Sequence, residues 1–285
     1  MRVRALGIDV SSSRGLDLVL LDEGGAIVET ARKVQPGELP AILAEIAPNV
    51  VAIDSPPGWG MSGGSRLTER ELRAFGIHSY GTPSDPKKAD NAFYDWMRVG
   101  IKTFEAAEQG GFPRWRNGSA KGRAMEVFPH ASAVVLAGCL PPKDASKRSW
   151  RQSVLEVNGV AAAGLRSADQ VDAALAALTG IYALKGRYTA LGDPREGAIV
   201  LPSHSLPASP YRRCTSPPKP DSQMHLPGMT PCSCGDPDCR EMTKGEFARG
   251  HDSKRKALLW ERARGGAEAI DELKRRGWEI PSDIR

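Results

Sequence analysis

The sequence predicts a mixed α/β domain, in which an antiparallel meander is followed by parallel strands flanked by helices. Three apolar runs, at residues 4–10, 16–21 and 26–33, are joined by short turns containing Gly15 and Gly24-Gly25, which is typical of a meander. A fourth apolar run at residues 50–54 follows a segment of helical length, so we expect it to lie parallel to a strand of the same sheet.

The overall composition is that of an ordinary water-soluble protein. The 285 residues carry a net charge of +5, and 26% of them are charged. We find no stretch of 18 uncharged apolar residues, and the N-terminus enters a strand without a signal-peptide core, so we expect a cytoplasmic protein without a membrane segment. The mildly basic charge fits a polyanionic partner without requiring one.

The remaining elements follow from periodicity and from turn residues. We expect a loop at residues 80–88 and a Gly- and Arg-rich surface loop at residues 110–122. Short strands are predicted at residues 125–128 and 198–201. The predicted helices cover residues 36–46, 66–75, 92–108, 131–137, 149–157 and 167–185.

The composition changes after residue 202, which predicts a second module. Seven of the 22 prolines lie within residues 203–231 without periodicity, as in a semi-rigid linker. We therefore divide the chain into a domain at residues 1–202, a Pro-rich linker at residues 203–231 and a module at residues 232–285.

Acidic residues recur in one context, in or at the end of short apolar strands. Asp9, Asp54 and Glu126 share it, and a buried carboxylate is costly unless it is paired. For Asp9 the partner could be a metal ion, a phosphate held through a metal, or the adjacent Ser-rich turn. Asp169 and Asp172 lie three residues apart near a helix start, so they face the same way, although acids are also favoured there by the helix dipole.

These acids together indicate a centre for divalent cations. Mg²⁺ and Mn²⁺ prefer oxygen ligands, and a pair of such ions needs several converging carboxylates to hydrolyse a phosphodiester. The order of elements is that of the ribonuclease H-like fold, in which the first and fourth strands are neighbours. The predicted catalytic and metal-binding residues, for two Mg²⁺ or Mn²⁺ ions, are Asp9, Asp54, Glu126, Asp169 and Asp172.

The chain resembles an uncharacterised bacterial family that is described as predicted nucleases with the ribonuclease H fold. The resemblance covers residues 4–202 and is carried by Gly7-Ile8-Asp9, the segments 53–58, 126–129 and 169–174, and the segment 192–200. The Asp-x-x-Asp on the last helix also resembles Holliday-junction resolvases of the RuvC type. The resemblance implies a metal-dependent nuclease that acts on DNA or RNA, and, by analogy with resolvases, a homodimer.

Two other functions remain open at this stage. The segment 7–13 followed by a hairpin also resembles the first phosphate-binding motif of sugar kinases and actin-like ATPases. That motif would imply a phosphotransferase, but a second acid-bearing meander is not found after residue 202. A nucleic-acid-binding protein without catalysis would be favoured if the acids do not converge.

The C-terminal module contains a zinc-like set of ligands. Structural Zn²⁺ sites are closed by four thiolate or imidazole ligands, and we expect a reducing environment rather than a disulfide framework. Cys139 is interpreted as a buried small hydrophobe. The predicted ligands are Cys232, Cys234, Cys239 and His251, with Cys214 as the alternative to His251. Basic residues with interleaved Trp260 and Trp278 follow, and either a solvated helix or a phosphate-binding surface would explain them. In the first domain, Arg14, Lys121 and Arg123 could hold phosphates, although solvated loop charges would explain these residues equally well.

Overall fold

The computed structural model describes residues 3–84 and 91–215, and two short strands beyond them. The chain divides into the units Met1–Pro227 and Gly228–Arg285. In the second unit, β8 (Met229–Thr230) pairs antiparallel with β9 (Met242–Thr243). The four predicted zinc ligands and the basic segment after them lie outside the described residues, so the zinc module stays a prediction.

The first unit is built on a seven-stranded mixed sheet with the order β3-β2-β1-β4-β5-β7-β6. The first three strands form an antiparallel meander, β4, β5 and β7 run parallel to β1, and β6 closes the edge antiparallel to β7. The meander and the parallel β1–β4 pair confirm the predicted topology, which is consistent with a ribonuclease H-like arrangement. The strands are β1 (Arg4–Ser11), β2 (Gly15–Asp22), β3 (Ile27–Val34), β4 (Val50–Asp54), β5 (Ala124–Val127), β6 (Thr189–Asp193) and β7 (Gly197–Leu201).

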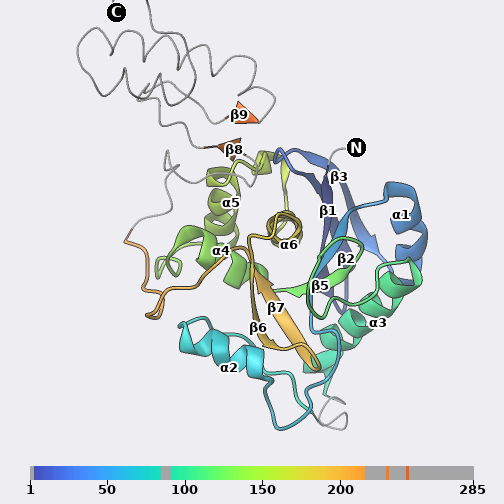
Figure 1. Ribbon diagram of the computed structural model, residues 1–285, viewed down its shortest axis with the longest axis horizontal. Coiled ribbons are helices and arrows are strands. Elements are labelled where there is room, and N and C mark those ends of the chain that lie inside the picture. The colour runs from blue at the N-terminus through green and yellow to red at the C-terminus, as the bar shows by residue number, and fades with distance from the viewer. Residues whose placement is uncertain (1–2, 85–90, 216–228, 231–241, 244–285) are drawn as a thin grey trace, which may run out of the picture. The chain divides into compact units, whose positions relative to one another are not determined.

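Helices cover both faces of this sheet (Figure 1). On one face, α6 packs over β1, β2 and β4, with α4 and α5 beside it; α1 and α3 pack together on the other. None of the helices in the described residues has the length and apolarity needed to cross a membrane. The α-helices are α1 (Leu39–Ile46), α2 (Leu67–Ala74), α3 (Asp95–Gln109), α4 (Pro129–Ala137), α5 (Lys147–Val157) and α6 (Ala168–Leu184).

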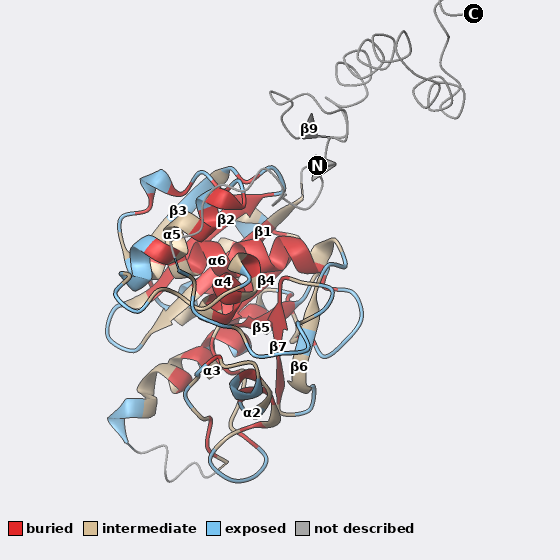
Figure 2. Cartoon of the chain, turned by 90° about the vertical axis from the view of Figure 1, so that its left-hand side faces the viewer, coloured by how far each residue is buried: buried red, intermediate tan, exposed pale blue. Residues whose placement is uncertain are grey.

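The core has two layers because successive side chains of a strand point to opposite faces of the sheet. Leu6 and Ile8 of β1 belong to the buried cluster that includes Phe104 of α3. Gly7, between them in the sequence, lies against α6. Helix α6 is apolar nearly all round and is the most deeply buried helix, at the centre of Figure 2. Its position over β1 places its first turns beside the end of that strand.

Gly7 allows this close approach of α6 to β1. A Cβ atom at residue 7 would lie 1.9 Å from the Ala173 carbonyl oxygen and 2.4 Å from the Ala177 nitrogen, both of which belong to the helix backbone. We therefore expect Gly7→Ala to push α6 away from the sheet and to lower the free energy of unfolding by about 1–3 kcal/mol. Chemical denaturation would measure this loss. Gly37→Ala, where a Cβ meets nothing within 4 Å, is the matched control, and equal stability of the two variants would contradict this packing.

One strand was not predicted. β6 is half-exposed at the edge of the sheet, and its sequence Thr-Ala-Leu-Gly-Asp lacks the apolar run that marks the buried strands. It forms only through antiparallel pairing with β7, across the turn at Pro194–Glu196. The predicted helix at residues 36–46 begins as a short 3-10 helix (Pro36–Glu38) and continues as α1.

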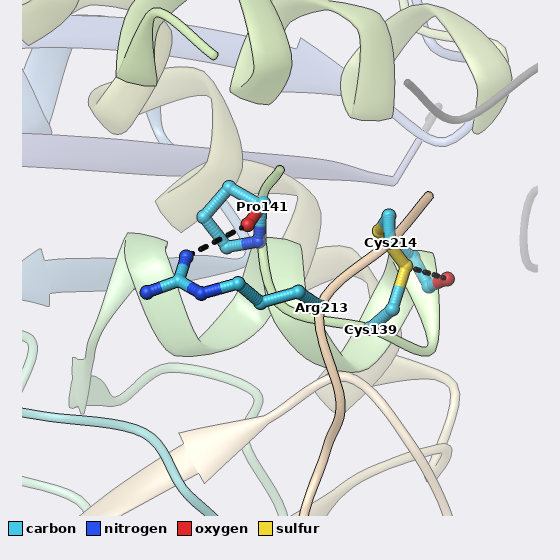
Figure 3. Close-up of a disulfide and its surroundings, with 5 residues drawn as sticks. Cys139, Pro141, Arg213 and Cys214 are labelled. Atoms are coloured by element: carbon cyan, nitrogen blue, oxygen red, sulfur yellow. Dashed lines mark hydrogen bonds between the residues drawn. A yellow bond between two sulfur atoms is a disulfide. The ribbon is translucent and has the colours of Figure 1, made fainter. Parts of the chain in front are cut away.

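Cys139 and Cys214 form a disulfide between segments 75 residues apart (Figure 3). Two backbone hydrogen bonds, from Leu140 to Arg212 and from Cys214 back to Leu140, hold the same segments together at 2.8 Å. The interpretation of Cys139 as a buried small hydrophobe was therefore wrong, and Cys214 is not a free thiolate for the zinc site. The sequence could not indicate this pair, because it depends on the chain after β7 returning to the end of α4.

Candidate metal centre

Asp9 and Asp54 lie side by side at the carboxyl end of two neighbouring parallel strands. Residues 5–9 of β1 pair with residues 50–54 of β4, so Asp9 and Asp54 stand opposite each other in the register. Paired residues of adjacent strands point to the same face of the sheet, which for these two acids is the face covered by α6. This is the neighbour relation that the sequence predicts for the first and fourth strands.

Asp172 completes the cluster from the second turn of α6. One carboxylate oxygen from each of Asp9, Asp54 and Asp172 lies within 4.8 Å of the others. The start of α6 is fixed by Ser167, whose hydroxyl accepts a hydrogen bond from the Gln170 backbone nitrogen at 3.1 Å. The capped start of α6 and the close packing of α6 on β1 therefore position Asp172. We call these three residues the acidic triad.

The other helical acid, Asp169, turns toward the β1–β2 turn. Its two carboxylate oxygens lie 3.2 and 3.1 Å from Nη2 of Arg14. Arg14 is largely exposed, so this ion pair lies at the rim of the cluster. Asp172 instead accepts hydrogen bonds from Nη1 of Arg151 on α5, at 2.6 and 2.5 Å. Two arginines thus hold the two helical acids in different places.

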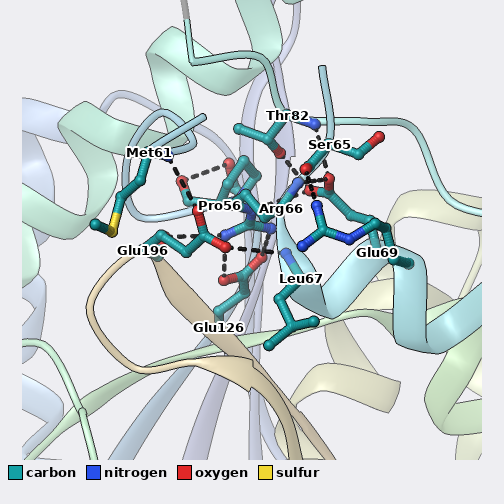
Figure 4. A network of polar contacts seen from close by, with 11 residues as sticks. Pro56, Met61, Ser65, Arg66, Leu67, Glu69, Thr82, Glu126 and Glu196 are labelled. Carbon is teal, nitrogen blue, oxygen red and sulfur yellow. Dashed lines mark hydrogen bonds and ion pairs between the residues drawn. The ribbon is translucent and has the colours of Figure 1, made fainter. Parts of the chain in front are cut away.

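Glu126 is buried but is bound to Arg66 rather than grouped with the triad (Figure 4). Its two carboxylate oxygens accept hydrogen bonds from Nη1 and Nη2 of Arg66 at 2.9 and 2.6 Å. The β4–β5 register pairs Glu126 with Ile53, one position away from Asp54. Since side chains alternate along a strand, Glu126 points away from the face that carries Asp54.

Arg66 also joins Glu126 to the start of α2. Its Nε donates to Glu69 at 2.9 Å, and Glu69 in turn accepts hydrogen bonds from the nitrogen and hydroxyl of Thr82 at 2.9 and 2.5 Å. Glu196 accepts from the Leu67 nitrogen at 2.9 Å. This largely buried network of hydrogen bonds connects β5, α2 and the β6–β7 turn.

Burial raises the pKa of every acid in the triad, and repulsion within the triad adds to the shifts of Asp9 and Asp54. The pKa of Asp9 rises from 3.8 to about 8, mainly because of burial and then because of the charges of Asp172 and Asp169. Burial, followed by the charge of Asp9, raises the pKa of Asp54 well above its usual value. The pKa of Asp172 is also raised by burial, although Arg151 opposes the shift. A divalent cation would remove this repulsion, and three hard carboxylate oxygens are the ligands that Mg²⁺ and Mn²⁺ prefer.

The raised pKa of Asp9 predicts how the stability of the metal-free protein depends on pH. Between its unfolded value near 4 and its folded value of about 8, the folded state binds more protons than the unfolded state, so stability falls as the pH rises. In EDTA we expect the thermal unfolding midpoint to be lower at pH 8.5 than at pH 6. The same scan with Asp9→Asn should show a smaller decrease, and identical pH profiles of the two proteins would contradict this prediction.

Three residues that surround these acids were not predicted from the sequence. Asp17 of β2 stands opposite Asp9 in the register, is buried, and contributes to the raised pKa of Asp9. The alternation of apolar and polar residues in Gly-Leu-Asp-Leu could have indicated Asp17, because directly opposed residues of two antiparallel strands point to the same face of the sheet. Arg66 and Arg151 had no such signal, since their pairs join residues 60 and 21 positions apart.

A basic cavity of about 660 Å³ lies near the predicted phosphate-contacting loop. Its positive lining comes from Arg114, Arg116, Lys121 and Arg123, with Glu105 and Glu108 opposing them. Two of the three basic residues that the sequence singled out therefore lie in one concavity, whereas Arg14 is paired with Asp169 at the triad.

Comparison with known proteins places this chain in a family. The model of the family "Protein of unknown function (DUF429)" matches residues 7–196. The chain belongs to this family. The match covers β1 to the β6–β7 turn and therefore includes all five predicted acids and Arg66. No curated protein matches the chain.

Among solved structures, the chain is similar to a RuvC structure from Thermus thermophilus. The two share 13% sequence identity with a TM-score of 0.34, over 70% of this chain and all of the other.

Proposed function

We propose that this domain hydrolyses phosphodiester bonds of nucleic acid with Mg²⁺ or Mn²⁺ bound at the acidic triad. The observation that supports the proposal is the convergence of Asp9, Asp54 and Asp172 from two strands and a helix. Three half-buried acids at such distances are unfavourable without a cation, as their raised pKa values indicate. A structural role alone would be met at lower cost by neutral side chains.

The triad is sufficient for two ions in this proposal. In phosphate-handling sites Mg²⁺ is usually held by one or two carboxylates, with water and substrate phosphate oxygens completing its shell. Asp9, Asp54 and Asp172 would hold the ions through their carboxylate oxygens. When bound, such ions activate a water molecule and neutralise charge on the leaving oxygen.

The protein's own residues hold this arrangement in place. Arg151 fixes the orientation of the Asp172 carboxylate, because its Nη1 donates to both carboxylate oxygens. Arg14 holds Asp169 at the rim, where the pair can exchange for a substrate phosphate because the arginine is exposed. We assign Glu126 a supporting role, since it binds Arg66 and the β4–β5 register turns it away from the face that carries Asp54.

Nucleic acid is the substrate class that the surface chemistry favours. The chain carries a net charge of +5, and four basic side chains line the 660 Å³ cavity. Cationic grooves of this kind neutralise successive backbone phosphates. The zinc module and a homodimer remain predictions, and in this proposal the module would tether the substrate or a partner.

Cleavage of a panel of nucleic acids tests this function. Single-stranded, duplex and four-way-junction DNA, with matching RNA, would be incubated with Mg²⁺, Mn²⁺ or EDTA and with wild type or Asp54→Asn. We expect metal-dependent cutting by the wild type alone. Metal-independent binding without cutting would support a binding protein without catalysis, and ATP hydrolysis without either would support the phosphotransferase alternative.

A further inference from the structure

A cationic cavity of about 390 Å³ lies next to the acidic triad on the side of α5. Four of the seven residues lining it are basic or imidazole side chains, His78, His130, Lys147 and Arg151, and none is acidic. Arg151 also binds Asp172, so the cavity and the triad share a wall. A concavity with this charge is suited to an anion.

Polar atoms in this cavity lack partners within the part of the chain that the structure describes. Three of the five buried side-chain polar atoms without a hydrogen-bond partner are Ser79 Oγ, His130 Nδ1 and Arg151 Nε, and all three residues line the cavity. Buried polar groups are normally hydrogen-bonded, and one polar ligand in this space could satisfy all three atoms. Burial, and then the charges of Arg151 and Lys147, lower the pKa of His130 to about 4, so the positive charge of the cavity at neutral pH comes from Lys147 and Arg151.

A second cavity of about 310 Å³ adjoins the first and reaches the triad. Ser79, Tyr80 and Phe128 line both cavities, whereas Asp54 and Trp96 line only the second. Its exposed lining is mostly apolar, with three aromatic rings, and the buried Arg66 network also contributes to it. The two adjoining cavities therefore offer an aromatic part, a cationic part and an edge at the metal centre.

Aromatic side chains also lie exposed beside this site. Tyr80 is 69% and Phe93 47% exposed, and their rings meet edge to face at 5.1 Å. Phe93 in turn contacts Tyr94. Large exposed aromatic rings are unfavourable in water, and next to a cationic groove they commonly stack against bases of single-stranded nucleic acid.

We propose that the two cavities hold one unpaired nucleotide of the substrate, with its phosphate in the cationic part and its base against Tyr80, Trp96 and Phe128. This inference rests on the proposed function and specifies its substrate as a single strand or an unpaired end or junction, because a base inside a duplex cannot reach the rings. The phosphate is either an internal diester or a terminal monoester. Ser79 and Arg151 would donate to it, and Lys147 would supply charge at the rim.

Binding in EDTA tests this inference separately from cleavage. Fluorescence anisotropy would compare a labelled single strand, with and without a 5′-phosphate, against the same sequence as a blunt duplex. The variants would be Lys147→Gln with Lys143→Gln as its control, and Tyr80→Leu with Tyr80→Phe as its control. Lys143 is exposed and does not line either cavity.

We expect the single strand to bind at least about tenfold more tightly than the duplex. Tyr80→Leu should weaken single-strand binding by about tenfold or more, whereas Tyr80→Phe retains it, since base stacking needs the ring. Lys147→Gln should weaken single-strand binding and lower the slope of its salt dependence by about one, which corresponds to the loss of one phosphate contact. Lys143→Gln should change neither the affinity nor the slope. A preference for the 5′-phosphate would assign a terminal monoester, and equal affinities an internal diester.

Equal binding of single strand and duplex, or equal effects of each variant and its control, would overturn the inference. If the proteins bind the single strand as expected but do not cleave any substrate with metal, the proposed function fails while the nucleotide site stands. If they cleave duplex with metal but show no single-strand preference, the proposed function stands and the nucleotide site fails.

Discussion

Replacing Asp9 with asparagine should abolish metal-dependent cleavage and, at the same time, stabilise the metal-free protein. Both effects have one cause, because Asp9 is held beside Asp54 and Asp172 in a half-buried position. With metal, the variant loses a ligand, and we expect a decrease in rate of at least about 10²-fold, since metal ions supply several kcal/mol of transition-state stabilisation. Without metal, the variant loses a buried repulsive charge, and its unfolding midpoint at pH 8 in EDTA should rise.

Thermal unfolding with and without Mn²⁺ would measure the second half of this prediction. Wild type should gain stability when Mn²⁺ is added, because a ligand that binds only the folded state stabilises it. Asp9→Asn should gain little. Asp144→Asn is the matched control, since Asp144 is exposed and lies outside the triad. A variant that is less stable than wild type in EDTA would mean that Asp9 is a structural residue.

Replacing Arg66 with alanine should cause the largest loss of stability. Arg66 is 2% exposed and neutralises two buried carboxylates, of Glu126 and Glu69. Breaking a buried pair on one side leaves uncompensated charge, which costs about 3–5 kcal/mol. Burial already raises the pKa of Glu126, and Arg66 opposes that shift, so without the arginine this carboxyl is expected to take up a proton.

Denaturant unfolding of a set of variants would measure this effect. Arg70→Ala, on the exposed side of the same helix, should change the free energy of unfolding by about 0.5 kcal/mol or less. The double variant Arg66→Met with Glu126→Gln should be more stable than Arg66→Ala, because it removes one of the charges left unpaired. If Arg66→Ala were no more harmful than Arg70→Ala, the network in Figure 4 would not stabilise the fold.

The sequence was sufficient to predict the framework of the site. Apolar runs that end in Asp9 and Asp54 marked buried strands carrying acids, and an apolar strand after a helix predicted the parallel pairing that brings them together. The i, i+3 spacing of Asp169 and Asp172 predicted a shared side of α6. The spacing did not predict that the two acids bind different arginines, Arg14 and Arg151, which come from other elements.

What could not be predicted depends on register and on distant contacts. Across the β4–β5 pair, Glu126 lies opposite the residue that precedes Asp54. A shift of one residue in the register turns a side chain to the opposite face of the sheet. Nothing in the residues near Glu126 fixes that register. The disulfide and the cationic cavity likewise join segments that only the folded chain brings together.

Anomalous diffraction from a crystal of the wild-type protein soaked in MnCl₂ would test the proposed metal centre most directly. We expect a manganese peak bounded by carboxylate oxygens of Asp9, Asp54 and Asp172, at metal–oxygen distances of about 2.0–2.2 Å, and absent from a soaked crystal of Asp54→Asn. A wild-type crystal with Mn²⁺ bound elsewhere, and with no peak among these three carboxylates, would contradict the proposal that the triad is a metal centre.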